Sequence, residues 1–140
     1  MNLLISFMLV FATYHRFGTA CKLNRVEVHN QLGPGIILHC ECRDFRDEPR
    51  FTLGSNDLKF NTSYDLEFKD DTLSFGKGKR TVHCHLKYER YYCNFRAYRE
   101  ASFGRCGALR SYEARKDGIY FRRSYAKPHD EFKFHWVVGK

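Results

Sequence analysis

The stretch YEARKDGIYFR, residues 112–122, carries the clearest fold signal in this 140-residue chain. Asp117-Gly118 is a favoured pair for a two-residue β-hairpin turn, in which both central residues take positive φ. The flanking residues then pair across two antiparallel strands: Lys116 opposite Ile119, Ala114 opposite Phe121 and Glu113 opposite Arg122. The last of these pairs joins opposite charges. The stretch predicts a hairpin, and Asp-Gly is typical of a structural turn.

Five further segments alternate apolar and polar residues with the period of a β-strand. They are RVEVHNQL (25–32), IILHCECR (36–43), TSYDLEF (62–68), RTVHCHLKY (80–88) and EFKFHWVV (131–138). Turn-forming residues separate them, as at Gly33-Pro34-Gly35, and no amphipathic helix pattern interrupts them. Short strands with one apolar face each bury that face in a shared core. The sequence therefore predicts one all-β domain, an antiparallel sandwich or a small barrel.

The first twenty residues indicate a secretory signal peptide. LLISFMLVFA (3–12) is apolar, but it is shorter than the roughly 20 residues with which a helix crosses a bilayer. Gly18 and Ala20 fit the small-residue positions of a cleavage site. We therefore expect residues 1–20 to be removed and residues 21–140 to form the secreted domain, with no transmembrane segment.

Six cysteines remain after that cleavage: Cys21, Cys40, Cys42, Cys84, Cys93 and Cys106. An even number in a short secreted chain is typical of a disulfide framework, so we expect all six to be oxidised. Six cysteines allow 15 connectivities. One local pair is favoured, because a turn over residues 87–90 places Cys84 opposite Cys93 on neighbouring strands, at a Cα separation that a disulfide accepts.

The chain is basic, with 24 Lys and Arg, 16 Asp and Glu and a formal net charge of +8, or +7 once Arg16 leaves with the signal peptide. This charge favours nucleic acid, acidic polysaccharide, lipid headgroups or an acidic protein surface as partner. Basic and aromatic residues mix most densely at 77–99 and 115–127. This pattern suits RNA stacking, a protein interface or an ordinary sheet surface, and secretion argues against nucleic acid. The candidate partner-binding residues are Lys87, Arg115, Arg122 and Arg123.

Two histidine–cysteine clusters raise the question of metal or acid–base chemistry. His39-Cys40-x-Cys42 and His83-Cys84-His85 contain zinc-type ligands, and His83, His85 and Lys87 are residue types found in acid–base sites. On a strand, however, His83 and His85 face away from Cys84. No nucleophile, orienting carboxylate or phosphate-binding glycine loop accompanies them. We predict no metal, no cofactor and no catalytic residue.

The motifs, taken in order, resemble those of the plant self-incompatibility protein family, the S-protein homologues. VEVHNQLG (26–33) is similar to the opening strand of the family, LHCECRD (38–44) to its His-Cys strand, and YDLEF (64–68) with FGKGKRTVHC (75–84) to its aromatic and Thr-x-x-Cys strands. Cys106 followed by YEARKDGIY (112–120) matches its terminal cysteine and Asp-Gly-Ile-Tyr signature. The resemblance covers residues 25 to 125 or so.

The resemblance implies a secreted β-sandwich that acts as an extracellular ligand, and a disulfide between Cys40 and Cys106. We predict a small antiparallel β-sandwich, stabilised by disulfides, that is secreted and works as a non-catalytic, monomeric ligand. Its expected partner is a cell-surface receptor protein, with acidic polysaccharide as a second candidate. The alternative functions are a secreted cationic defence protein that binds anionic surfaces and a small extracellular nuclease. Residues 44–50, where the chain departs most from the family, form a second candidate interface.

Two processing events are expected of the secreted protein, and mass spectrometry checks both. The mature chain should begin at Cys21, because Gly18 and Ala20 fit the cleavage site. Asn61-Thr62-Ser63 is a glycan acceptor sequence just before a predicted strand, so peptides with Asn61 should carry a glycan that a glycosidase removes. Secreted material that retains residues 1–20, or that carries no glycan on Asn61, contradicts the corresponding expectation.

Overall fold

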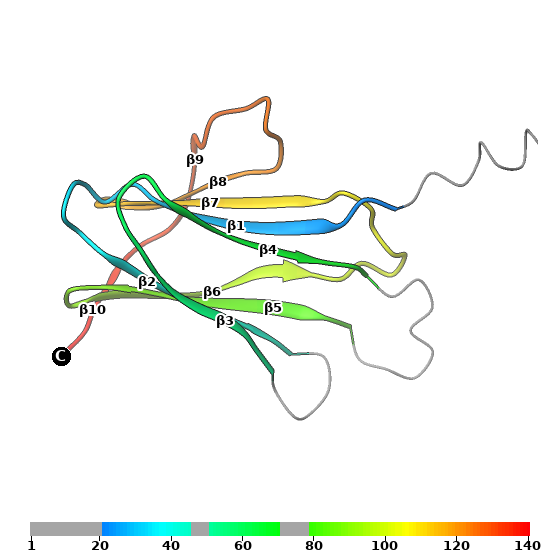
Figure 1. The fold of residues 1–140 in the computed structure, drawn as a ribbon, viewed down its shortest axis with the longest axis horizontal. Helices are drawn as coiled ribbons and strands as arrows, with labels where there is room; N and C mark the ends of the chain where they lie inside the picture. The colour runs from blue at the N-terminus through cyan, green and yellow to red at the C-terminus, as the bar shows by residue number, and fades with distance from the viewer. Residues whose placement is uncertain (1–20, 46–50, 71–78) are drawn as a thin grey trace, which may run out of the picture.

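The computed structural model describes residues 21–45, 51–70 and 79–140, which form two five-stranded sheets facing each other as a β-sandwich (Figure 1). The first sheet has the order β4 (Ser63–Phe68), β1 (Asn24–Asn30), β7 (Leu109–Arg115), β8 (Gly118–Arg122) and β9 (Glu131–Phe134). The second has the order β10 (Val137–Val138), β6 (Tyr91–Arg99), β5 (Thr81–Tyr88), β2 (Leu38–Asp44) and β3 (Phe51–Leu58).

Alternation along each strand places one face of each sheet in the shared core. Val26 and Val28 of β1, Leu38 of β2 and Leu86 of β5 are all fully buried. The apolar faces predicted for these strands are therefore confirmed, as is the β-sandwich class. The predicted signal peptide lies outside the described residues.

One strand pair is parallel. β1 and β7 run side by side in the first sheet, with Val28 opposite Tyr112 on the core face and Glu27 opposite Ser111 on the outer face. All other strand pairs of the described residues are antiparallel. A parallel pair has no connecting turn of its own, so the sequence contains no local signal for it.

The β7–β8 hairpin forms, but its predicted register is wrong. Arg115 lies opposite Gly118 and Ala114 opposite Ile119, so the turn residues are Lys116 and Asp117. The observed register joins Ala114 with Ile119 and Tyr112 with Phe121 on the core face. The predicted register would instead have placed Lys116 beside buried Ile119, which explains why the chain turns earlier.

Gly118 is a strand residue and not the second turn residue. Its φ is +154°, and a Cβ atom at this position would lie 2.3 Å from Cε2 of Phe132 and 2.7 Å from the carbonyl oxygen of Phe134. β9 therefore packs against the bare backbone of β8. The glycine is required for this close approach of two strands.

The predicted strand at 131–138 is two strands in different sheets. β9 pairs with β8 in the first sheet, and β10 pairs with Tyr91 and Tyr92 of β6 in the second. The chain crosses between the sheets at this end of the sandwich (Figure 1), where the indole of Trp136 donates a hydrogen bond of 2.7 Å to the carbonyl oxygen of Arg115. Within β9, a register shift against β8 sets Phe134 opposite buried Ile119 and Phe132 opposite Tyr120, so Phe132 faces outward and is 40% exposed.

Two disulfides form, between Cys21 and Cys106 and between Cys42 and Cys84. The predicted Cys84–Cys93 pair is wrong because the β5–β6 hairpin sets Cys84 opposite Phe95, while β2 brings Cys42 directly opposite Cys84. The Cys40–Cys106 pair implied by the resemblance is also wrong. Cys21 reaches Cys106 because residues 22–25 run along residues 105–108, joined by a hydrogen bond from Gly107 N to Lys22 O.

Cys40 and Cys93 are free thiols, contrary to the expectation that all six cysteines are oxidised. They lie two strands apart, since Cys40 and Cys93 are both paired to Leu86 of the intervening strand. Both are buried, and burial raises the pKa of Cys40 to about 12 and that of Cys93 to about 11. Each therefore behaves as a small apolar core residue and not as a nucleophile.

Substitution of Gly118 tests the close approach of β8 and β9. We expect Gly118→Ala to lower the free energy of unfolding by about 2–4 kcal/mol, because the collision of the new Cβ with β9 adds to the backbone cost of a positive φ. Gly35→Ala is the matched control: Gly35 has a φ of +78° but no atom within 4 Å of a built Cβ, so only the backbone cost of about 1 kcal/mol applies. Equal losses for both variants in thermal or denaturant unfolding would contradict this explanation.

Candidate functional site

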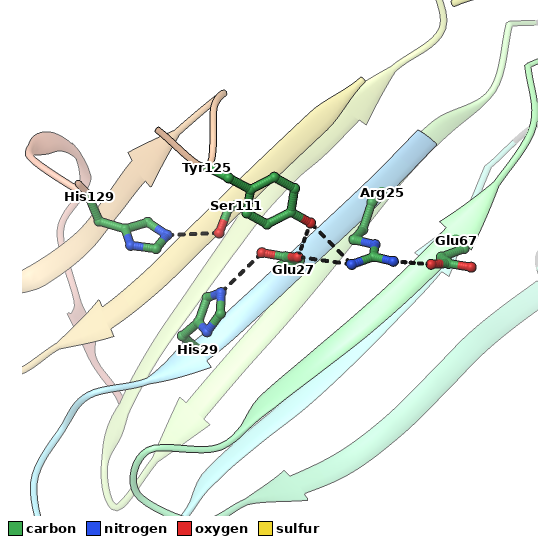
Figure 2. A network of polar contacts seen from close by, with 7 residues as sticks. All are labelled: Arg25, Glu27, His29, Glu67, Ser111, Tyr125 and His129. Carbon is green, nitrogen blue, oxygen red and sulfur yellow. Dashed lines mark hydrogen bonds and ion pairs between the residues drawn. The ribbon is translucent and has the colours of Figure 1, made fainter. Parts of the chain in front are cut away.

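A polar network covers the outer face of the first sheet, between β1, β7 and the segment 123–130 that follows β8 (Figure 2). Glu27 lies at its centre and is only 4% exposed. Its Oε1 accepts a hydrogen bond of 2.5 Å from the hydroxyl of Tyr125, and its Oε2 lies 3.2 Å from Nε2 of His29. Arg25 contacts Glu27, pairs with Glu67 and donates to the hydroxyl of Tyr125 at 3.1 Å.

The partners of Glu27 keep it ionised despite its burial. Burial alone would raise the pKa of this carboxyl, but hydrogen bonds from Tyr125 and His29 outweigh that effect, and the pKa is lowered. A buried carboxylate with such partners stabilises the fold only while they stay in place. Glu27 therefore fixes Tyr125, and with it the segment 123–130, on the sheet.

Ser111, His129 and Glu113 make the contacts of a hydrolase triad. Oγ of Ser111 lies 2.7 Å from Nε2 of His129, and Nδ1 of His129 lies 3.1 Å from Oε2 of Glu113. In an enzyme this order links nucleophile, base and orienting carboxylate. Here Ser111 is 0% and His129 6% exposed. A substrate has no access to the hydroxyl, so the triad contacts anchor the segment 123–130.

His129 is held neutral. Burial lowers its pKa to about 4, aided by the charges of Arg122, His29 and Arg115 and opposed by that of Glu113. The contacts assign the neutral tautomer that donates from Nδ1 to Glu113 and accepts the Ser111 proton at Nε2. The sequence analysis did not identify Ser111 or His129 as candidate site residues. A triad is recognised by the geometry of its side chains and not by their spacing in the sequence.

The four predicted partner-binding residues do not form one surface. Arg115 donates to Glu113 at 2.5 Å and to the carbonyl oxygen of His129 at 2.8 Å, and its guanidinium lies 4.1 Å from the ring centre of Tyr120. Arg122 donates to the carbonyl oxygen of Lys127 at 3.2 Å. Arg123 is exposed at the end of β8. Lys87 is exposed on the second sheet, and most of the other candidate interface, residues 46–50, lies outside the described residues.

The outer face of the second sheet carries the histidines and lysine of β5. His83, His85 and Lys87 point outward, whereas Cys84 is 2% exposed and faces the core. The predicted opposite orientation of histidine and cysteine is confirmed. Within the described ranges, no three His, Cys, Asp or Glu side chains gather as a metal-binding group. No helix in this part of the chain is long and apolar enough to cross a membrane.

A small β-sandwich held by two disulfides is typical of the class of small extracellular proteins. Residues 25–136 match the family described as Plant self-incompatibility protein S1. S-protein homolog 14 of Arabidopsis thaliana is 40% identical over 151 residues, covering 100% of both chains. S-protein homolog 25 of the same plant is 34% identical over 131 residues, covering 91% of this chain and 93% of the relative.

A solved self-incompatibility protein homologue superposes with a TM-score of 0.61 at 25% identity, covering 85% of this chain and 98% of its own. Its structure represents a widespread family of small, highly stable, secreted proteins from plants. The chain therefore belongs to the plant self-incompatibility protein S1 family, the S-protein homologues, as its motifs indicated. The prediction of a secreted protein is confirmed with it.

The buried histidine predicts a loss of stability in acid. Because the folded pKa of His129 is about 4 and an unfolded histidine titrates near 6.5, the unfolded state binds more protons between these values. The free energy of unfolding should therefore fall as pH drops from about 6.5 to 4, with His129 contributing about 2–3 kcal/mol. Below this window the lowered pKa of Glu27 acts in the same direction.

Denaturant unfolding across pH measures this slope. His129→Gln should flatten it, whereas His135→Gln, which removes an exposed histidine, should leave it unchanged. A His129→Gln variant with the wild-type slope between pH 6.5 and 4 would show that the buried imidazole is not its source.

Proposed function

We propose that this protein is a non-catalytic extracellular ligand that a cell-surface receptor recognises. The burial of Ser111 and His129 is the main support for this proposal. The three side chains that have the geometry of a catalytic triad, Ser111, His129 and Glu113, are covered by the segment 123–130, so a substrate cannot reach the hydroxyl of Ser111. A ligand needs a rigid surface and no reactive group. Membership of a family of small secreted plant proteins agrees with this role.

The segment 123–130 is the surface that we assign to the receptor. Arg123 is exposed, and Tyr125 is 58% exposed while its hydroxyl is held by Glu27. Arg123 lies 5.6 Å from the ring centre of Phe121, and the guanidinium beside the ring of Tyr125, at 5.5 Å, is that of Arg122. Arginine and tyrosine are enriched in interface hot spots, and a tyrosine whose position is already fixed loses little side-chain entropy on binding. Arg115 and Arg122 support this surface from beneath, and we expect their neutralisation to lower stability.

Two processing proposals accompany this role. A mature chain that starts at Cys21 keeps the disulfide to Cys106. Asn61 lies in an exposed turn with a φ of 64°, and its Oδ1 accepts a hydrogen bond of 2.8 Å from Gln31. Its backbone N–H donates to the carbonyl oxygen of Asn30 at 2.9 Å, whereas its side-chain nitrogen Nδ2 has no hydrogen bond to another described residue, which agrees with the proposed glycan.

Binding of labelled protein to intact plant cells tests the receptor proposal. We expect saturable binding that is lost when the cells are first treated with protease. Arg123→Gln should slow association several-fold and weaken its salt dependence, because rim charges act on the rate of encounter. Its melting temperature should hardly change. Lys59→Gln, an equal change of charge at another exposed site, is the control. Protease-resistant binding, or an Arg123→Gln variant that binds like wild type, contradicts the proposal.

The alternative functions give different results with the same purified protein. A cationic defence protein binds vesicles of phosphatidylglycerol and phosphatidylcholine, and its binding to cells survives protease. An extracellular nuclease cleaves RNA and loses that activity in His83→Gln. Either positive result replaces the receptor proposal.

A further inference from the structure

Three basic side chains stand in one row on the outer face of the second sheet. Arg43 of β2 lies directly opposite His83 of β5, which lies directly opposite Arg96 of β6. Neighbouring strands are only about 4.8 Å apart, and like charges in directly opposite positions destabilise a sheet. Arg43 is paired with Glu41 at 2.7 Å. Arg96 is exposed and has no ion pair or hydrogen bond to any described side chain.

The row lies in a hollow. A depression of about 670 Å³ is lined by Arg43, His83, Arg96 and their neighbours Glu41, His85 and Asn94. A second depression of about 440 Å³ shares His85 and Asn94 with the first and adds Lys87, Arg90 and Lys140. Because they share these two residues, the depressions adjoin, and we refer to them together as the trough. Its lining contains five Lys or Arg and two Glu side chains, hence a positive balance with the histidines neutral.

We propose that this trough binds a linear carboxylated polysaccharide, with successive carboxylates at the Arg43–His83–Arg96 row and at Lys87. His83 and Lys87 are four residues apart on one strand, which corresponds to about 13 Å. A small anion cannot touch both ends, but a polymer with a charge on each unit can. The inference rests on the proposed extracellular role and is independent of the receptor surface, which lies on the first sheet.

The chemistry of the trough favours a sugar chain over an acidic protein segment. Glu41 lies between the cations, with its side chain 22% exposed. Sugar hydroxyls donate hydrogen bonds to such a carboxylate, whereas the side chains of an Asp- or Glu-rich segment repel it. His85 and Asn94, bonded to each other, add neutral groups for hydroxyls between the charges.

Titration of His83 offers a way to measure binding within the trough. It faces Arg43 and Glu41 from β2, Arg96 and Asn94 from β6, His85 along its own strand and the ring of Phe45. Burial and the charge of Arg96 lower its pKa. A carboxylate seated in the row favours the charged imidazole, so binding should raise this pKa, and affinity should increase as pH falls from 7 to 5 while carboxylates stay ionised.

Purified protein and labelled oligogalacturonate test the inference, with the fully methyl-esterified oligomer as the uncharged probe. We expect binding to oligogalacturonate only. Arg43→Gln/Arg96→Gln should lower the affinity at least about tenfold, because two charge-assisted contacts are lost. Lys59→Gln/Lys116→Gln, which removes the same charge from exposed positions outside the trough, should stay within about twofold. His83→Gln should abolish the increase in affinity at lower pH.

Folding of the variants is checked in the same samples. Arg96→Gln alone should keep or raise the melting temperature, because Arg96 has no ion pair or hydrogen bond to a described side chain that the change would remove. Equal binding of the methyl ester, equal losses in both double variants or preferential binding of polyglutamate would overturn the inference, the last in favour of an acidic protein partner. The cell-binding assay of Arg123→Gln is a separate measurement, so failure of either proposal leaves the other testable.

Discussion

The parallel pairing of β1 with β7 is the constraint on which the rest of the first sheet depends. Its register sets Val28 opposite Tyr112 in the core and, on the other face, Glu27 opposite Ser111 and His29 opposite Glu113. A shift of β7 by one residue relative to β1 would turn the carboxylate of Glu113 into the core. One register therefore determines the core and the outer polar network together, and it joins two segments that are remote in sequence.

The buried carboxylate of Glu27 holds the segment 123–130 against the outer face of the first sheet, because it accepts a hydrogen bond from Tyr125. An ionised group at 4% exposure costs free energy unless all its partners are present. Those partners come from β1 itself and from the segment 123–130, so the segment closes on the sheet for electrostatic reasons as much as for packing. His129 repeats the arrangement nearby, neutral and bonded to Ser111 and Glu113. The network gives the segment one conformation, a requirement for a surface that a partner recognises.

The sequence predicted what depends on local pattern and failed where distant segments meet. Alternation identified the core faces of β1, β2 and β5, and Asp117-Gly118 located a hairpin. The predicted register of this hairpin was wrong because Gly118 is needed where β9 packs against β8, and not in the turn. β9 comes from a later part of the chain, so the local pattern could not show this. The split of residues 131–138 between two sheets and the pairing of Cys42 with Cys84 depend likewise on strand order. Of the candidate site residues, Arg123 and Lys87 are exposed, but nothing in their spacing showed that they lie on different sheets.

Charged side chains are paired on the outer face of the first sheet and left open to solvent in the trough of the second. This difference indicates where a charged partner binds, which the net charge of the chain does not. On the first sheet every carboxylate near the centre has a basic or hydroxyl partner, and two arginines are used to hold a segment in place. On the second sheet Arg43 and Arg96 lie on either side of His83, and the charge of Arg96 opposes protonation of that imidazole. A folded chain is locally consistent except where another task prevails. Two arginines on either side of a histidine in an open trough are such an exception, and a bound anionic partner would make this arrangement favourable.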